Sequence, residues 1–182
     1  MERTSPEEVM DLFQMNFFAA VGACQAVLPP SAPKGGTIVN VSSIGGRIGL
    51  PFHGVYSASK FALEGLTEAL RMAVKPFGVR VVLVEPRDIR PPFTAHRRLA
   101  AAGEGDPYRK RFARALRQVK GDEEAGGKKA AVARLVLPVL RHPNPRLRYT
   151  VGNPVQRLAV AARGILPGRL FEWGIMRYCR LT

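Results

Sequence analysis

The chain has 182 residues, of which 46% are hydrophobic and 23% are charged. This composition is typical of one globular domain and excludes the collagen-like, coiled-coil and disordered classes. No apolar run reaches the roughly 18 residues of a membrane-spanning helix, and the polar start at Met1 does not predict a signal peptide.

Basic residues outnumber acidic ones by 28 to 14, which gives a net charge of +14. The excess is uneven, because residues 128–182 hold eleven Lys or Arg and one acid, Glu172. Such a bias favours nucleic acid, an anionic membrane or a phosphate-bearing cofactor, and a solvated basic surface is the plain alternative. The sequence has no zinc spacing, aromatic-rich RNA motif or helix-turn-helix pattern. We therefore expect no nucleic-acid partner, and membrane-surface association is the weaker alternative.

The first predicted element is a long helix over residues 6–28. Ser5 can cap it, Pro6 suits its first turn, and Glu8 completes a capping box. Apolar residues then recur at helical spacing until Pro29 and Pro30 end the helix. A short β-branched strand, Thr37–Ser42, follows.

A glycine-containing loop leads into a second long helix over Gly54–Lys75, which ends at Pro76-Phe77-Gly78. Residues 79–84 then form an apolar strand without alternation. That pattern indicates a strand covered on both faces, as in a parallel sheet. Helix followed by strand, twice over, predicts an α/β fold.

The second half of the chain is predicted to be more helical and more basic. The expected segments are an irregular stretch to about Pro107, a basic helix over Tyr108–Lys120, a polar linker over Gly121–Lys129, a helix over 130–141 that Pro138 should kink or end, a strand over Arg148–Val151, and an apolar-basic helix from Pro154 that is interrupted at Pro167-Gly168. Cys24 and Cys179 lie in apolar periodic stretches, which favours two buried thiols over a disulfide and hence a cytoplasmic location.

Tyr56 and Lys60 stand four residues apart at the start of the second predicted helix, which places both on one face. Such a pair alone is common on helix surfaces. Ser43 lies thirteen residues earlier, where a predicted strand ends. The carboxyl ends of strands in open α/β sheets are where ligands bind, so the combination indicates a catalytic site.

On these residues the chain resembles the short-chain dehydrogenase/reductase family. The matching stretches are Asn40-Val41-Ser42-Ser43, Tyr56-Ser57-Ala58-Ser59-Lys60 and Val84-Glu85-Pro86. Residues 61–65, 76–79 and 146–152 look like the branch that acts on hydroxysteroids and retinol. The resemblance implies the C-terminal part of a Rossmann-type doubly wound parallel sheet, with its last three strands. It divides the chain into a catalytic core (1–95), a variable substrate region (96–146), and the last strand with basic helices (147–182).

The resemblance also implies roles for single residues. Tyr56 would be the general acid/base, and the Lys60 ammonium would lower the pKa of the phenol from about 10. Lys60 would also hold the nicotinamide ribose, and Ser43 would donate to the substrate oxygen. Asn16, a polar residue in an apolar helix, would help hold a water in a proton relay, unless it is merely a partly exposed asparagine. The implied cofactor is NAD or NADP, bound by Tyr56, Lys60, Pro86, Ile89 and Thr94.

Two positions depart from the family pattern. Arg87 stands where the family has glycine, and Pro91 where it often has threonine. The first adds bulk and the second removes a hydroxyl and an N–H, so we expect weaker or altered cofactor binding. His53, His96 and His142 have no metal-ligand spacing, and no metal site is expected.

The family's front half begins with a glycine-rich turn that binds pyrophosphate, and no such turn occurs ahead of the catalytic helix, since Gly45, Gly46 and Gly49 lie after Ser43. The residue that distinguishes NAD from NADP is absent with it. A start placed too late and a genuine truncation both remain open. The chain is expected to represent an oxidoreductase acting on a lipophilic alcohol or ketone. The alternative is an inactive remnant that serves as an interaction module.

Two further expectations concern assembly and stability. Helices 6–28 and 54–75 carry apolar stripes and form the family's usual interface, which predicts a homodimer; the alternative is that these stripes only pack on the sheet. Strand 37–42 would become an unpaired apolar edge in a sheet of only three strands, and such edges favour aggregation. The 182-residue chain alone is therefore expected neither to fold robustly nor to bind the cofactor tightly.

Overall fold

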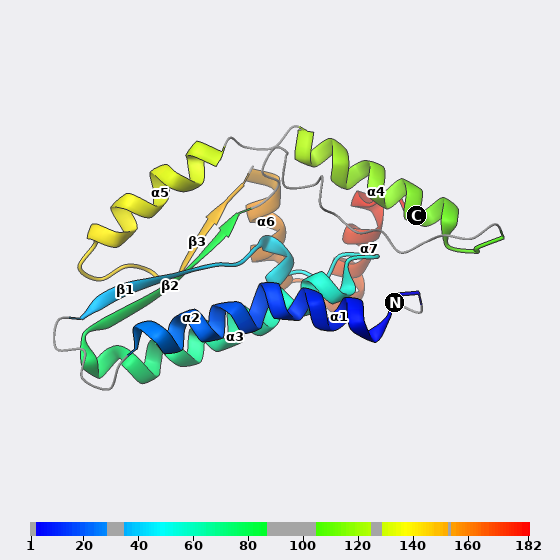
Figure 1. Ribbon diagram of the computed structural model, residues 1–182. Helices are drawn as coiled ribbons and strands as arrows, with labels where there is room; N and C mark the ends of the chain where they lie inside the picture. Colours follow the sequence, from blue (N-terminus) through cyan, green and yellow to red (C-terminus); the bar gives the residue numbers. More distant parts are fainter. Residues whose placement is uncertain (1–2, 29–34, 87–104, 125–128, 153) are drawn as a thin grey trace.

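The computed structural model describes residues 3–28, 35–86, 105–124, 129–152 and 154–182. Within them, three strands form a parallel sheet in the order β1-β2-β3: β1 is Gly36–Val41, β2 is Val79–Pro86 and β3 is Arg148–Val151. Helix α3 (Gly54–Val74) covers one face and α5 (Lys129–Arg141) the other (Figure 1). The predicted α/β class with three parallel strands is confirmed.

Strand β2 is the centre of the core. Its residues Val81–Val84 have no exposed surface, because helices cover both faces and a strand lies on each side. Ile38 pairs with Val81 on one side, and Leu83 pairs with Arg148 on the other. The uninterrupted apolar run that predicted a doubly covered strand therefore has its expected cause.

The first helix differs from the expected continuous helix over 6–28. It consists of α1 (Pro6–Phe13), a π turn (Gln14–Phe18) and α2 (Ala19–Val27). The capping box forms as predicted, because the Ser5 hydroxyl accepts from the Glu8 amide at 3.2 Å and the Glu8 carboxylate accepts from the Ser5 amide at 2.9 Å. A π turn inserts one extra residue into a helix and often lies at a functional site, and this one contains Asn16.

One predicted boundary in the second half was wrong, and another was nearly correct. Helix α4 (Arg109–Glu124) continues into the segment expected to be a polar linker. Helix α5 continues past Pro138 to Arg141. Pro138 is exposed near the end of that helix, so the carbonyl that loses its N–H partner can be hydrated there, and the helix is not forced to stop.

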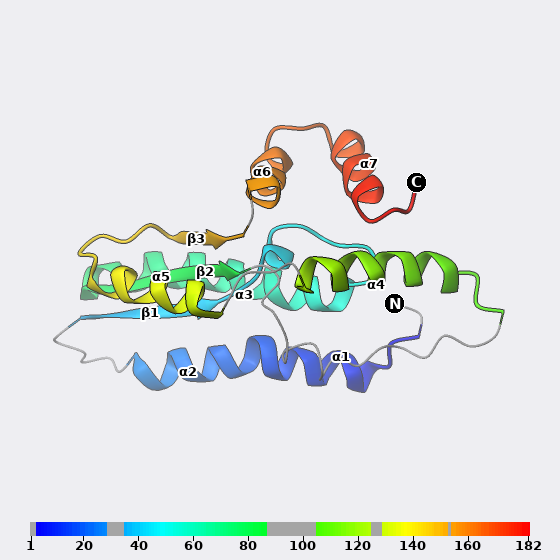
Figure 2. The same ribbon diagram turned by 90° about the horizontal axis from the view of Figure 1, so that it is seen from above.

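The C-terminal region forms two short helices, α6 (Pro154–Arg163) and α7 (Gly168–Tyr178), with the interruption at Pro167 that the sequence predicts. They lie beyond β3 and project from the body of the molecule (Figure 2). Cys24 and Cys179 are both buried and neither is in a disulfide, as expected. No helix in the described part of the chain is long and apolar enough to cross a membrane.

Candidate active site

The predicted catalytic residues gather where β1 ends and α3 begins. Ser43 follows β1 and caps a 3-10 turn (Ile44–Gly46), with its Oγ accepting from the Gly45 amide at 3.1 Å. A methyl group added to Gly45 would stand 3.1 Å from Cε1 of Tyr56 and 3.5 Å from Oγ of Ser43. Gly45 therefore allows the serine hydroxyl and the tyrosine ring to come together around its bare α-carbon.

Lys60 lies one helical turn after Tyr56 on α3. Its Nζ donates a hydrogen bond of 3.1 Å to the carbonyl oxygen of Val41, the last residue of β1. Burial lowers the pKa of the Lys60 ammonium from its ordinary value, and the negative charge of Glu64 partly opposes this. The ammonium is thus held at the carboxyl end of β1, on the helix that carries Tyr56.

Asn16 reaches the same helix from the π turn. Its Nδ2 donates to the hydroxyl of Ser59 at 3.1 Å, and that hydroxyl donates to the carbonyl oxygen of Tyr56 at 2.8 Å. Ser59 is completely buried. The structure thus links three residues, Asn16, Ser59 and Tyr56, of which the sequence had not singled out Ser59. The available signal was a small polar side chain on the inward face of an apolar helix.

Of the residues predicted to contact the cofactor after β2, only Pro86 lies within the described part of the chain. Pro86 is buried at the end of β2, beside the end of β1. Ile89 and Thr94, together with the departures Arg87 and Pro91, lie outside the described residues.

His53 precedes α3, and its Nδ1 lies 3.2 Å from the carbonyl oxygen of Pro51. No group of three potential metal ligands occurs among the residues that the structure describes.

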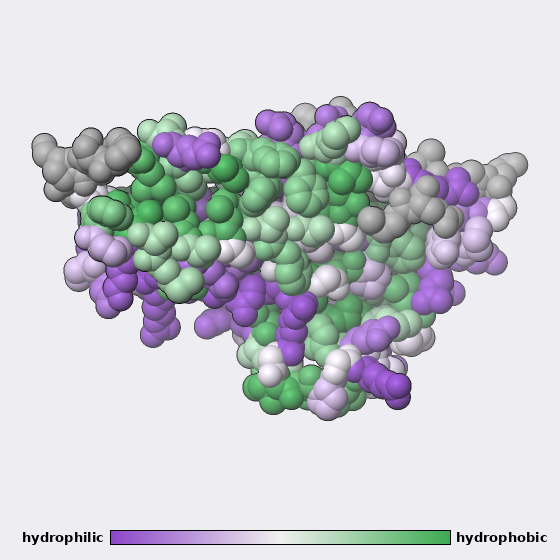
Figure 3. Space-filling view, turned by 90° about the horizontal axis from the view of Figure 1, so that it is seen from below, coloured by the Kyte–Doolittle hydropathy of each residue, from purple (hydrophilic) through white to green (hydrophobic). Residues whose placement is uncertain are grey.

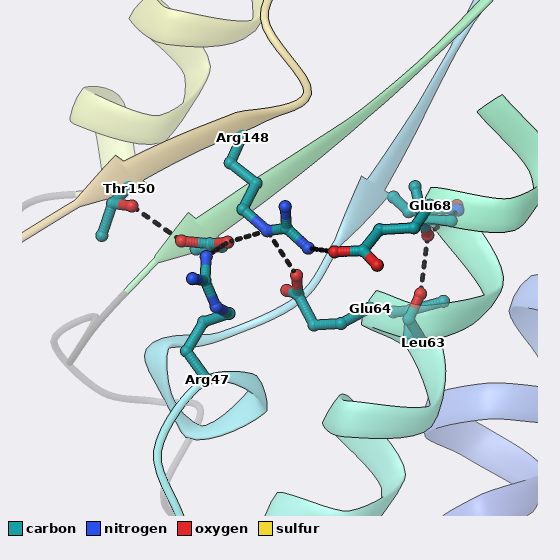
Figure 4. A network of polar contacts seen from close by, with 9 residues as sticks. Arg47, Leu63, Glu64, Glu68, Arg148 and Thr150 are labelled. Atoms are coloured by element: carbon teal, nitrogen blue, oxygen red, sulfur yellow. Dashed lines mark hydrogen bonds and ion pairs between the residues drawn. The ribbon is translucent and has the colours of Figure 1, made fainter. Parts of the chain in front are cut away.

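A buried ion network lies behind the site (Figure 4). Its centre is Glu85, whose side chain has no exposed surface. The carboxylate of Glu85 lies 3.3 Å from Nη1 of Arg47 and 3.2 Å from Nε of Arg148, and accepts from the Thr150 hydroxyl at 2.7 Å. Arg47 follows the turn that Ser43 caps, so this network fastens the Ser43 loop to the ends of β2 and β3.

Arg148 extends the network to α3. Its Nε lies 3.0 Å from Oε2 of Glu64, and its Nη2 pairs with Glu68. Burial raises the pKa of Glu64 and the charge of Glu85 adds to this, whereas the hydrogen bond and charge of Arg148 lower it. Spacing along the chain did not predict this network. The signal was Glu85, a carboxylate inside an apolar strand, because a buried charge requires partners.

The comparisons with known proteins agree with this geometry. The family model described as short chain dehydrogenase matches residues 1–101. A 3-ketodihydrosphingosine reductase of Bacteroides thetaiotaomicron is 36% identical over 177 residues, covering 96% of this chain and 66% of that protein. The human 17-beta-hydroxysteroid dehydrogenase type 1 is 32% identical over 155 residues, covering 82% of this chain and 47% of that protein.

Solved structures have the same fold. A short-chain dehydrogenase from Streptomyces avermitilis superimposes with a TM-score of 0.75 at 30% identity, covering 96% of this chain and 63% of that one. A short-chain dehydrogenase/reductase from Burkholderia phymatum, solved in complex with NAD, gives a TM-score of 0.72 at 23% identity, with 90% and 60% covered. The chain thus spans between about half and two thirds of the length of these relatives. By its family match, its relatives and its Ser43, Tyr56 and Lys60 motifs, the chain belongs to the short-chain dehydrogenase/reductase family.

Proposed function

We propose that the chain carries the catalytic part of a nicotinamide-dependent oxidoreductase that interconverts an alcohol and a carbonyl compound. The observation that supports this most is the placement of Ser43 and Tyr56 around Gly45, with Lys60 one turn further along α3. Ser43 directly follows β1 and Lys60 donates to the carbonyl of Val41 at the end of β1, which is the edge where open α/β sheets bind their ligands.

Each residue has a distinct task in this proposal. Ser43 accepts a hydrogen bond from the Gly45 amide, so its own O–H is left to donate to the substrate oxygen, where charge develops. Tyr56 donates its phenolic proton to that oxygen during reduction and takes it back during oxidation. Lys60 places a positive charge beside the phenol, which favours the phenolate form. Asn16 orients this part of α3 through Ser59.

The bound cofactor, NAD or NADP, would exchange the hydride with the substrate carbon. Lys60, Tyr56 and Pro86 are proposed to hold its nicotinamide and ribose, because all three lie at the ends of β1 and β2 or at the start of α3. Ile89 and Thr94 are proposed to complete this contact from the segment after β2. Within residues 1–182, no glycine-rich turn precedes the first helix to hold the pyrophosphate.

The proposed substrate is lipophilic. Phe112 of α4 packs edge-to-face against Phe52, with ring centroids 5.6 Å apart, and Phe52 lies four residues before Tyr56. Tyr108, at the start of the same helix, is half exposed. Aromatic side chains from the variable region thus reach the neighbourhood of the site. The names of the two sequence relatives, a ketosphingoid reductase and a hydroxysteroid dehydrogenase, support the same substrate class.

A homodimer remains part of the proposal. The surface of α1, the π turn, α2 and α3 exposes large apolar side chains that a second copy could cover: Met10, Met15, Phe18, Val27 and Met72.

A cytoplasmic location also stays a prediction.

The test measures nicotinamide absorbance with NADH and NADPH against long-chain ketones, ketosteroids, retinal and short polar ketones. It uses the 182-residue chain and a chimaera that carries, ahead of Met1, the part of the Bacteroides relative outside the match. We expect turnover of lipophilic ketones by the chimaera, and Tyr56→Phe should lower kcat by about two to four orders of magnitude.

Tyr149→Phe is the matched control, because it removes the same hydroxyl from β3, where Tyr149 accepts from the Arg146 amide. Unchanged turnover in Tyr56→Phe would overturn the catalytic assignment. A preference for short polar ketones would overturn the substrate class alone. A chimaera that folds but turns over nothing would favour the inactive interaction module.

A further inference from the structure

The helices α6 and α7 expose more large apolar side chains than a solvated surface requires. Ile165 in the turn between them is 82% exposed, Leu158 of α6 is 68% exposed and Trp173 of α7 is 54% exposed. Val155, Leu166 and Leu170 add to the same segment. Large exposed apolar side chains gathered in one segment favour contact with another apolar phase.

This exposure is not caused by helices that fail to pack. Gln156 of α6 is buried, as is Cys179 directly after α7. The Tyr178 hydroxyl donates to Asp122 of α4 at 2.5 Å. Each helix therefore has an inner side that contacts the protein and an outer side with apolar residues three positions apart, Val155 and Leu158 in α6 and Leu170 and Trp173 in α7.

Arginines accompany these apolar residues. Residues 154–182 contain five arginines and a single acid, Glu172. The Arg177 guanidinium lies 5.9 Å from the ring centroid of Trp173, and Arg163 lies 5.1 Å from that of Phe61. Hydrophobic and hydrophilic residues lie side by side on this projecting lobe in Figure 3. Tryptophan and leucine beside arginine is the composition of helices that lie in a membrane interface.

We propose that α6 and α7 form a docking surface for an anionic lipid bilayer, in which both helices lie at headgroup depth without crossing it. With 10 and 11 residues, they are too short to span a bilayer. A second copy is the weaker occupant, because a symmetric contact would place the five arginines of one lobe against those of the other. An anionic surface complements both the charge and the apolar residues. The inference does not depend on the proposed enzymatic activity.

Trp173 makes the proposal directly testable, since it is the only tryptophan of the chain. The 182-residue chain is mixed with vesicles of phosphatidylcholine alone, or of phosphatidylcholine with phosphatidylglycerol, and tryptophan emission is recorded. We expect a blue shift with the anionic vesicles only, and quenching when their acyl chains carry bromine. Added salt should weaken binding, because it screens the arginine contribution.

Two pairs of variants separate the apolar and the charged contributions. Leu158→Ser with Ile165→Ser should weaken vesicle binding at least tenfold, whereas Phe77→Ser with Leu137→Ser, both more than half exposed on other elements, should not. Arg157→Gln with Arg169→Gln should weaken it about 30-fold, and Arg109→Gln with Arg111→Gln on α4 should have little effect. Circular dichroism checks that every variant keeps its fold.

Several results would overturn the proposal. One is the absence of a spectral shift with anionic vesicles, and another is equal binding to neutral ones. Equal losses in the control variants would show that net charge alone attracts the chain. A blue-shifted dimer without lipid, converted to a monomer by Leu158→Ser with Ile165→Ser, would show that the surface joins two copies instead.

Discussion

Strand β2 and the helix pair α6–α7 differ in how far their apolar side chains are exposed. Val81–Val84 in β2 have no exposed surface, whereas Leu158, Ile165 and Trp173 are each more than half exposed. Both regions also hold charged groups, but Glu85 at the end of β2 is enclosed by arginines and Glu172 on α7 is exposed. The sheet region is therefore built to hold a fixed geometry, and the C-terminal pair to meet another surface.

The largest expected effect comes from removing the buried charge of the first region. Glu85→Ala removes the buried carboxylate that Arg47, Arg148 and Thr150 share, and each lost hydrogen bond to a charged group costs about 1.5–3 kcal/mol of unfolding free energy. Urea unfolding followed by circular dichroism should show that the cooperative transition is lost or moved to much lower urea. Glu172→Ala should leave the transition in place. A similar result for both variants would remove the distinction between the regions.

A smaller change at Gly45 should affect activity more than stability. A methyl group there would stand 3.1 Å from Tyr56 Cε1, so the ring has to shift by a few tenths of an ångström. Because catalysis requires near-exact placement of the acid/base, Gly45→Ala should lower kcat of the active chimaera about tenfold or more. Gly65→Ala on the exposed side of α3, where no atom lies within 4 Å, is the control and should keep full turnover. Normal kcat in Gly45→Ala would show that the ring position is not critical.

Glu64 offers a pH test of the ion network. Burial raises the pKa of Glu64, so the folded chain holds that proton more tightly than the unfolded chain. The resulting stability is complete below the ordinary carboxyl pKa and is lost as pH rises through the raised value. Glutamine resembles the protonated form. Glu64→Gln should therefore have the same free energy of unfolding as the wild type near pH 4. As pH rises, it should become more stable than the wild type.

The measurement is urea unfolding at a series of pH values, with Glu68→Gln as control. Glu68 pairs with the same Arg148, but its side chain is 49% exposed. We expect that variant not to become more stable than the wild type as pH rises, because it loses an ion pair and removes no buried carboxylate. If Glu64→Gln instead becomes less stable than the wild type as pH rises, the attraction of Arg148 for the Glu64 carboxylate outweighs the cost of burying it.

The sequence predicted the parts of the fold that local patterns determine. The Ser5 cap, the buried strand β2 and the position of Ser43 at the end of β1 all follow from short-range spacing and one family motif. The π turn at Gln14–Phe18 did not, because an apolar helix with an extra residue keeps nearly the same periodicity.

The ion network was missed for a different reason. Arg148 lies 84 positions from Glu64, and only the paired strands bring it to Glu85 and α3. The same limit applies to Ser59, whose partner Asn16 lies 43 positions earlier. Contacts between distant segments depend on the tertiary arrangement, which spacing along the chain does not encode. That α5 continues past Pro138 depends on the exposure of this residue, which spacing along the chain does not encode either.

The most direct test of the account locates cofactor binding along the chain. Hydrogen exchange is measured by mass spectrometry on the active chimaera, with and without NADH or NADPH. We expect slower exchange after cofactor addition at the end of β1, in the Ser43–Gly46 turn and at the start of α3, and unchanged exchange across α6 and α7. Protection confined to α6 and α7, or none near Ser43 and Tyr56 despite saturating cofactor, would contradict the assignment of the catalytic site.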